Sequence, residues 1–198
     1  MRVLSFSRPW LWAVLHPDPA IKKTTENRTW APPVSQIGKR FALHSAKSWD
    51  EDALRYWLEI GIKEFPMRKD LYPSGAVLGV ATIDRIRTFV DPGELDVSDP
   101  TGRRFIRPPT YPTDLPESQR RWFFGPFGWI LTDVIALDTP IPLKGGQGLR
   151  ELPADVEAEI DRQLADIARR PIVRYLTPEE SDTRVSELHR LARQAGKI

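Results

Sequence analysis

The chain has 198 residues, of which 28% are charged and 40% hydrophobic, and its formal net charge is +2. These proportions are typical of a soluble globular protein and exclude a largely disordered chain, while the mildly basic balance permits a polyanionic partner without requiring one. The absence of cysteine excludes disulfide frameworks, thiolate metal sites and cysteine nucleophiles, and it fits a cytoplasmic protein.

The predicted elements begin with a short strand at residues 3–6 and a helix that follows Ser7 and Pro9, with Ser7 as its expected N-cap. A second helix, expected at 49–61, has Ser48 in the same role. Further strands are expected at residues 25–30, 39–47, 75–86 and 127–137, and further helices at 153–170 and from 177 onward. No stretch approaches the roughly 18 apolar residues of a membrane span, and Arg8 and Pro9 interrupt the first apolar run, so neither a span nor a signal peptide is expected.

Short strands with glycine at their bends favour closure over an open parallel sheet. We therefore predict an α+β fold: a small mixed β-barrel with flanking helices over residues 1–152, and a C-terminal helical extension over 153–198, packed on or beside the barrel. The extension offers a surface for a homodimer. Residues 90–121, rich in proline and charge, are expected to form a functional or mobile loop.

The segment "KTTENR" at residues 23–28 fits the pattern Lys-x-x-Glu-x-Arg. Around it, in order, stand "SRPWLWAVL", "GKRFALHSAKSW", "YPSGAVLGV", "FFGPFGWIL" and "PLKGGQG". Together these segments resemble the ASCH family of the PUA-like superfamily over about residues 1–150. The resemblance implies a compact β-barrel with a cleft beside the motif, in a superfamily whose members handle RNA or modified bases. One departure is Ile21, where the family pattern usually has glycine.

The motif side chains suit the recognition of a base. In an extended segment Glu26, Arg28 and Trp30 share one side, so the acceptors of Glu26 and the rigid donor fork of Arg28 project together. Trp30 or Trp10 offers a flat surface for an unstacked base. Lys23, if buried beside Arg28, loses proton affinity and becomes a candidate general base. The alternative is a structural ion pair of Glu26 and Arg28 covered by Trp30.

His44 is the remaining candidate catalyst, although a lone histidine on a strand is more often a core or surface residue. Additional nucleotide-binding candidates are Ser45, Lys47, Tyr72 and Trp122. Five arginines are interleaved with aromatic residues: Arg103, Arg104, Arg107, Arg120 and Arg121. They would suit an electrostatic track for a single-stranded nucleic acid. The alternative is that they only keep a loop solvated.

The first functional hypothesis is a nucleic-acid-binding domain, for RNA or another single strand, with a cleft for a base or nucleotide. The alternative is a metal-independent hydrolase in the same cleft. As a ribonuclease, Lys23 or His44 would take the 2′-hydroxyl proton while Arg28 stabilises the phosphorane; as an amidohydrolase on N4-acetylcytidine-type nucleosides, Lys23 and Glu26 would activate water. We predict no metal or cofactor. The three histidines are scattered along the sequence, and it has no GxSxG, Walker, HExxH or dinucleotide-binding motif.

Overall fold

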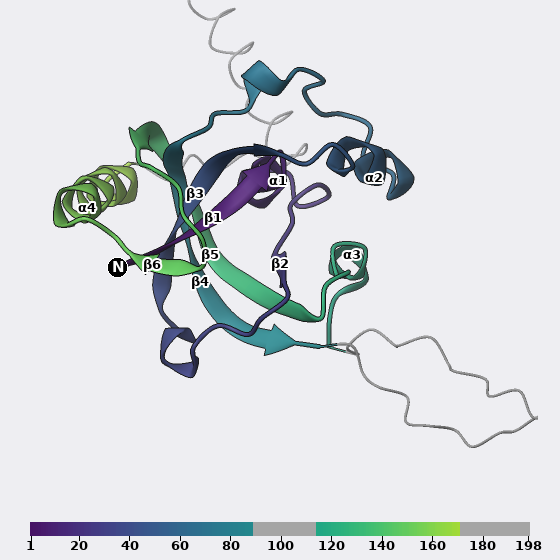
Figure 1. Cartoon of the computed structure of the whole chain (residues 1–198), viewed down its shortest axis with the longest axis horizontal. Helices are drawn as coiled ribbons and strands as arrows, with labels where there is room; N and C mark the ends of the chain where they lie inside the picture. Colours follow the sequence, from purple (N-terminus) through teal and green to yellow (C-terminus); the bar gives the residue numbers. More distant parts are fainter. Residues whose placement is uncertain (89–113, 171–198) are drawn as a thin grey trace, which may run out of the picture. The chain divides into compact units, whose positions relative to one another are not determined.

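The fold is built on one mixed six-stranded sheet, seen in a computed structural model that describes residues 1–88 and 114–170 (Figure 1). The strands follow the order β2-β5-β4-β3-β1-β6, and β1 and β3 are parallel while the other pairs are antiparallel. Their bounds are β1 Arg2–Arg8, β2 Thr25–Arg28, β3 Arg40–Trp49, β4 Ala76–Arg87, β5 Phe127–Pro142 and β6 Leu149–Glu151. The helices are α1 Trp10–Leu15, α2 Ala53–Glu59, α3 Glu117–Arg120 and α4 Ala154–Ala168, with 3-10 turns at Val34–Gln36 and Lys69–Leu71.

The sheet is strongly curved, and the mixed α+β class predicted from the sequence is confirmed. The β4–β5 pairing shifts register at three places, and such irregularities bend and twist a strand pair. At Gly79 in β4 an added Cβ would lie 2.6 Å from the carbonyl oxygen of Ile135, so β5 crosses there at a distance that only glycine permits. The two edge strands, β2 and β6, are not paired with each other, so the predicted closure into a barrel is not confirmed.

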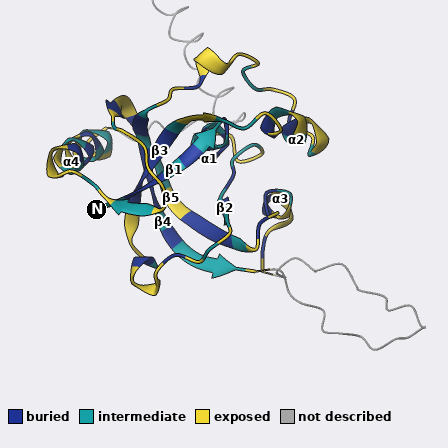
Figure 2. Ribbon diagram, in the orientation of Figure 1, coloured by how far each residue is buried: buried dark blue, intermediate teal, exposed yellow. Residues whose placement is uncertain are grey.

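Buried residues are frequent along the strands of this sheet (Figure 2), and they form separate core clusters on its two faces. On one face, Leu4 and Phe6 of β1 pack with Trp129 of β5 and with Leu11 and Val14 of α1. On the other face, the neighbouring residue Val3 packs with residues of β3, β4 and β5 and with α4: Ala42, Val77, Val80, Leu137, Ile141, Val156 and Ile160. The alternation along β1 therefore fixes α1 on one face and α4 on the other.

Contacts along the chain divide it into two compact units, Met1–Leu164 and Ala165–Ile198. The first part of α4 thus belongs with the sheet. The helix expected from residue 177 lies outside the described residues, as does most of the 90–121 segment. Of the helices in the described ranges, none is both long and apolar enough to cross a membrane.

Both predicted serine N-caps are wrong. The helix α1 follows Pro9 with no side-chain cap, and α2 begins only at Ala53. The reason is that β3 continues to Trp49, so Ser48 is still in extended backbone, where its hydroxyl donates to Ser7 Oγ at 3.2 Å.

Candidate functional site

The motif residues Lys23, Glu26 and Arg28 converge: Glu26 and Arg28 share one side of β2, and Lys23 reaches Glu26 from the segment just before the strand. Glu26 lies between the two cations: its Oε2 accepts from Lys23 Nζ at 2.7 Å, and its Oε1 lies 3.0 Å from Arg28 Nη2. Lys23 and Glu26 are buried, with side chains 1% and 8% exposed, whereas Arg28 is 22% exposed. The guanidinium also donates to the backbone carbonyl of Ser5 in β1 at 2.8 Å. Arg28 therefore links the edge strand β2 to the far side of the curved sheet.

The ammonium of Lys23 is the least solvated charge of this group. Burial lowers the pKa of Lys23 below its usual value; the charge and hydrogen bond of Glu26 oppose that shift, and the nearby Arg28 adds to it. The amine also lies 6.0 Å from the centroid of the Trp10 ring. The direction of the shift is the one predicted for a lysine buried beside Arg28.

Side-chain amides cover the outer edge of β2. Asn27 donates to the carbonyl of Trp122 at 2.7 Å and accepts from the backbone N–H groups of Phe124 and Gly125 at 3.0 Å. Gln119, at α3, accepts from Thr24 N–H at 2.8 Å. These bonds tie β2 and the residue before it to the segment 119–125, and they fix β2 where Glu26 and Arg28 are needed.

A small hollow of about 230 Å³ lies beside the motif. Lys23, Glu26 and Arg28 line it together with aromatic and polar neighbours: Phe6, Ser7, Trp10, Asn27, Asp50 and Phe124. Trp10 is held by a hydrogen bond from its Nε1 to Asp50 Oδ2 at 2.7 Å. The cleft expected beside the motif is present, with Trp10 in its wall.

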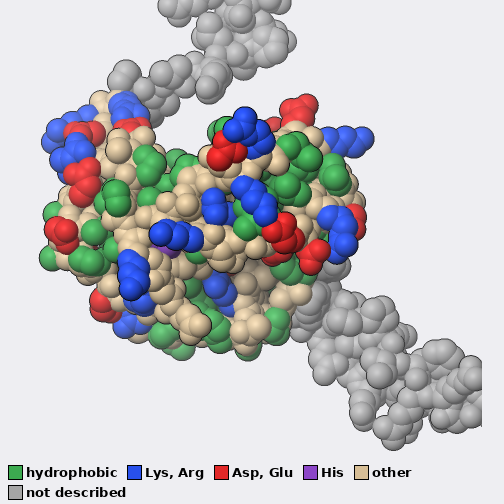
Figure 3. Space-filling model, turned by 45° about the horizontal axis from the view of Figure 1, so that its top comes forward, with side chains coloured by type: hydrophobic (Ala, Val, Ile, Leu, Met, Phe, Trp, Pro, Cys, Tyr) green, Lys and Arg blue, Asp and Glu red, His purple; other side chains and the backbone are tan. Residues whose placement is uncertain are grey.

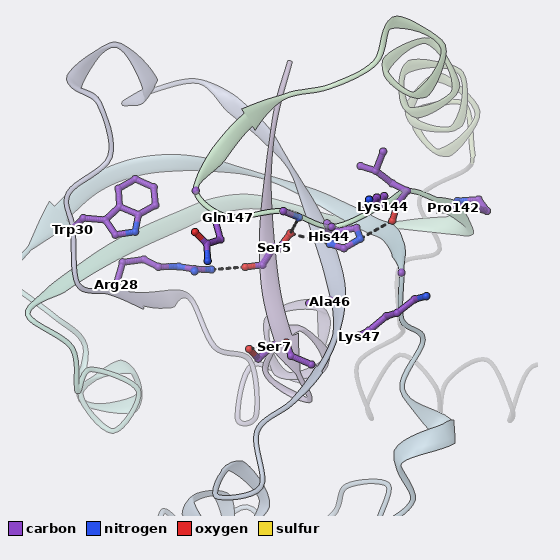
Figure 4. Close-up of a pocket in the computed structure, with 16 residues that line it drawn as sticks. Ser5, Ser7, Arg28, Trp30, His44, Ala46, Lys47, Pro142, Lys144 and Gln147 are labelled. Carbon is purple, nitrogen blue, oxygen red and sulfur yellow. Dashed lines mark hydrogen bonds between the residues drawn. The ribbon is translucent and has the colours of Figure 1, made fainter.

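A larger cavity of about 1070 Å³ lies on the other side of Arg28, which lines both hollows (Figure 4). Its wall comes from β1, β3, the residue Trp30 after β2, and the loop 142–148 before β6. Its charged lining residues are Arg28, Lys47 and Lys144, and no Asp or Glu lines it within the described chain. On the face drawn in Figure 3, Lys and Arg side chains surround a hollow. The cavity is therefore suited to an anion.

Trp30 and a glycine-rich loop shape opposite parts of this cavity. Trp30 is half-buried and fixed edge-on against Trp129, with ring centroids 4.8 Å apart. The loop "KGGQG" at residues 144–148 passes so close to β3 that a Cβ on Gly145 would lie 2.8 Å from His44 Cε1. Small residues here let the backbone itself form the cavity wall.

His44 lies at the floor of the same cavity, only 1% exposed. Its Nε2 lies 2.9 Å from the carbonyl oxygen of Leu143, and its Nδ1 lies 3.0 Å from Ser5 Oγ. Burial lowers the pKa of His44, the hydrogen bond to Leu143 opposes this shift, and the positive charge of Arg150 adds to it. The ring is consequently neutral near pH 7.

Three residues predicted for nucleotide binding lie away from the two hollows that Arg28 lines. Ser45 and Tyr72 are buried, donate to the carbonyls of Pro73 and Pro66 at 2.6 Å, and line a separate, mainly apolar hollow of about 280 Å³ that Arg28 does not line. Burial raises the pKa of Tyr72 to about 12. Trp122 is fully buried, in the core cluster that also contains Trp57, and presents no face to a ligand.

The predicted arginine track is only partly described. Arg103, Arg104 and Arg107 lie outside the described residues. Arg120 donates to the carbonyl of Leu115, and Arg121 to those of Ile60 and Ala20. These two arginines line none of the three hollows, so their role in binding stays a prediction.

Sequence reasoning missed Ser5, Lys144 and the supporting residue Asn27. The "KGGQG" segment was a visible signal for the loop that carries Lys144, because adjacent glycines indicate close backbone approach. A single serine in an apolar strand carries no such signal. In residues 1–88 and 114–170, no group of three or more His, Asp or Glu side chains is arranged to hold a metal ion.

No family model matches the chain, nor does any curated protein. Among solved structures, the chain is similar to the crystal structure of ASCH from Zymomonas mobilis, with 16% identity and a TM-score of 0.42 over 81% of this chain and 93% of that chain. Two point mutants of that protein give 17% and 15% identity and TM-scores of 0.42 and 0.39, covering 81% of this chain and 96% and 94% of theirs. ASCH is the family that the sequence motifs resemble.

We expect Glu26→Gln to lower the free energy of unfolding by about 3 to 5 kcal/mol, because it leaves the buried charge of Lys23 without its partner. Urea denaturation measures this change. Asp52→Asn removes the carboxylate of an exposed ion pair with Arg55 and should cost at most about 1 kcal/mol. Equal losses in the two variants would contradict a special role for the buried pair.

The lowered pKa of His44 predicts a loss of stability in acid. Below about pH 6.5 the unfolded chain binds a proton at this position and the folded chain does not, so the free energy of unfolding falls as the pH falls. Between about pH 7.5 and about pH 5.5, urea denaturation should show a smaller fall for His44→Gln than for the wild type. Identical pH profiles would show that His44 titrates normally in the folded protein.

Proposed function

We propose that this protein binds single-stranded RNA and holds one nucleotide in the larger cavity. The observation that carries the proposal is the lining, in which Arg28, Lys47 and Lys144 are joined by no carboxylate of the described residues. Phosphate groups supply most of the affinity of such complexes, so a wall whose charged side chains are all cationic favours a phosphorylated ligand. We choose RNA over DNA because the sequence motifs resemble the PUA-like superfamily, whose members handle RNA or modified bases.

The arrangement of the lining suggests how a nucleotide would lie. Arg28 and Trp30 stand at one end of the cavity, and Lys47 and Lys144 at the other (Figure 4). A base stacked on Trp30, with Arg28 at its edge, would direct the sugar and phosphate toward the two lysines. The N–H groups of the loop 144–148 would add donors for phosphate oxygens.

The side chain of Arg28 is preorganised for ligand binding. Glu26 and the Ser5 carbonyl both hold Nη2 of its guanidinium, so little side-chain entropy remains to be lost on binding. Because Glu26 also neutralises Lys23, the cavity keeps a net positive lining without an unpaired charge in the interior.

The proposal predicts that Lys47→Ala and Lys144→Ala each weaken binding of a short single-stranded RNA, together by about tenfold or more. Each substitution should also reduce the slope of log affinity against log salt by about 0.7, the value for one lost contact to a single strand. Fluorescence anisotropy at several salt concentrations measures both quantities. Lys63→Ala, an exposed lysine that lines none of the hollows, is the matched control.

Unchanged affinity in the double lysine variant, or in a folded Arg28→Ala variant, would contradict the proposal. Single-stranded DNA of the same sequence is the comparison for sugar preference, and equal affinity for both strands would overturn the choice of RNA.

A hydrolase that uses Lys23 and Glu26 is the second candidate. In its favour, both residues line the small hollow and the pKa of Lys23 is lowered. We place it second because the Lys23 amine is 1% exposed and already donates to Glu26. Cleavage of labelled RNA, or release of acetate from N4-acetylcytidine, that is lost in Lys23→Met would place it first.

A further inference from the structure

A serine and a histidine face each other on the floor of the larger cavity. Ser5 of β1 and His44 of β3 are register partners in the parallel pair, and Ser5 Oγ lies 3.0 Å from His44 Nδ1. The pairing of β3 with β4 shifts register between Leu43 and His44, an irregularity that re-aims side chains. Two adjacent strands thus hold both groups in a fixed geometry.

The second ring nitrogen sets the direction of the Ser5–His44 hydrogen bond. The carbonyl oxygen of Leu143, 2.9 Å from Nε2, only accepts, so Nε2 carries the proton in the neutral ring. Nδ1 is then unprotonated and accepts the hydroxyl proton of Ser5. A hydroxyl that donates to an imidazole oriented by a third group has the arrangement of an activated nucleophile, with a backbone carbonyl in the place of a carboxylate.

The cavity leaves room for a reacting group at this pair. Both side chains line it, and Ser5 is half-buried rather than sealed (Figure 4). The N–H of Gly146 lies 3.4 Å from Ser5 Oγ, and the Arg28 guanidinium is bonded to the Ser5 carbonyl. A backbone donor of the loop 144–148 therefore lies beside the reacting hydroxyl, in the region where charge would develop on an attacked carbonyl.

We infer that Ser5 and His44 form a nucleophile and base pair for hydrolysis of carboxylic esters in the larger cavity. Ser5 Oγ bonds to the ester carbonyl carbon as its proton passes to His44 Nδ1, and the carbon–oxygen bond to the alcohol breaks as that proton is returned to the alcohol. Water then attacks the acyl-serine and gives a proton to Nδ1. The carboxylic acid leaves, and the proton goes back to Ser5 Oγ. The neutral state of His44 near pH 7 suits it as the acceptor.

The cationic lining further favours an ester whose alcohol portion carries a negative charge, and this preference rests on the proposed function. The reaction at Ser5 does not, because it needs only the pair and an accessible carbonyl. An experiment can therefore contradict RNA binding and leave hydrolysis at Ser5 standing, or the reverse.

A biotin-linked fluorophosphonate tests the pair, since an activated serine displaces fluoride and keeps the phosphonyl group. We expect one adduct on the full-length wild type, mapped by peptide mass spectrometry to Ser5, together with turnover of p-nitrophenyl acetate. His44→Gln retains a donor for Leu143 and should react at least about 100-fold more slowly. Ser35→Ala removes an exposed serine that lines none of the three hollows, and should react as the wild type.

The absence of an adduct on wild-type Ser5, or an equal labelling rate in folded His44→Gln, would overturn the inference and show a hydrogen bond that only satisfies a buried ring. Mapping the adduct in the wild type keeps the result independent of how Ser5→Ala folds. Labelling that persists in Lys47→Ala, with RNA affinity unchanged in that variant, would support the pair while contradicting the proposed function.

Discussion

The carboxylate of Glu26 is the group on which the rest of the site depends. One of its oxygens accepts from Lys23 and the other lies against Arg28, so a single buried acid compensates one fully buried cation and orients a second. A charge as deeply buried as that of Lys23 is tolerated only with such a partner. The geometry of both hollows follows, because Glu26 lines the smaller one and sets the position of Arg28, which lines both.

Arg28 also compensates for what the sheet lacks. The edge strands β2 and β6 do not pair with each other, yet the sheet curves enough for a β2 side chain to reach the backbone of Ser5 in β1. The open side becomes a cavity instead of a continuous strand ladder, with the loop 144–148 and Lys47 completing its wall. A closed ladder would leave less room there. The incomplete closure is thus the structural origin of the proposed ligand site.

The sequence predicts the motif geometry well because it depends on local rules. A strand places Glu26 and Arg28 on one side, and the long apolar runs are indeed the interior strands β4 and β5. Features that depend on distant partners are not predictable in this way. The contact between Ser5 and His44 requires parallel pairing of segments 39 residues apart, and the burial of Trp122 requires knowledge of which aromatic residues fill the core. Closure of the barrel likewise depends on edge pairing, which periodicity does not specify.

The most direct test of the central claim is to find where RNA contacts the protein. Ultraviolet cross-linking of a short single strand that contains 4-thiouridine, followed by peptide mass spectrometry, locates those contacts on the folded chain. The account predicts cross-links at Trp30, at residues 44–48 and at residues 142–148, with competition by unlabelled RNA. Cross-links that avoid all three segments, and fall instead on α2 or α4, would contradict it.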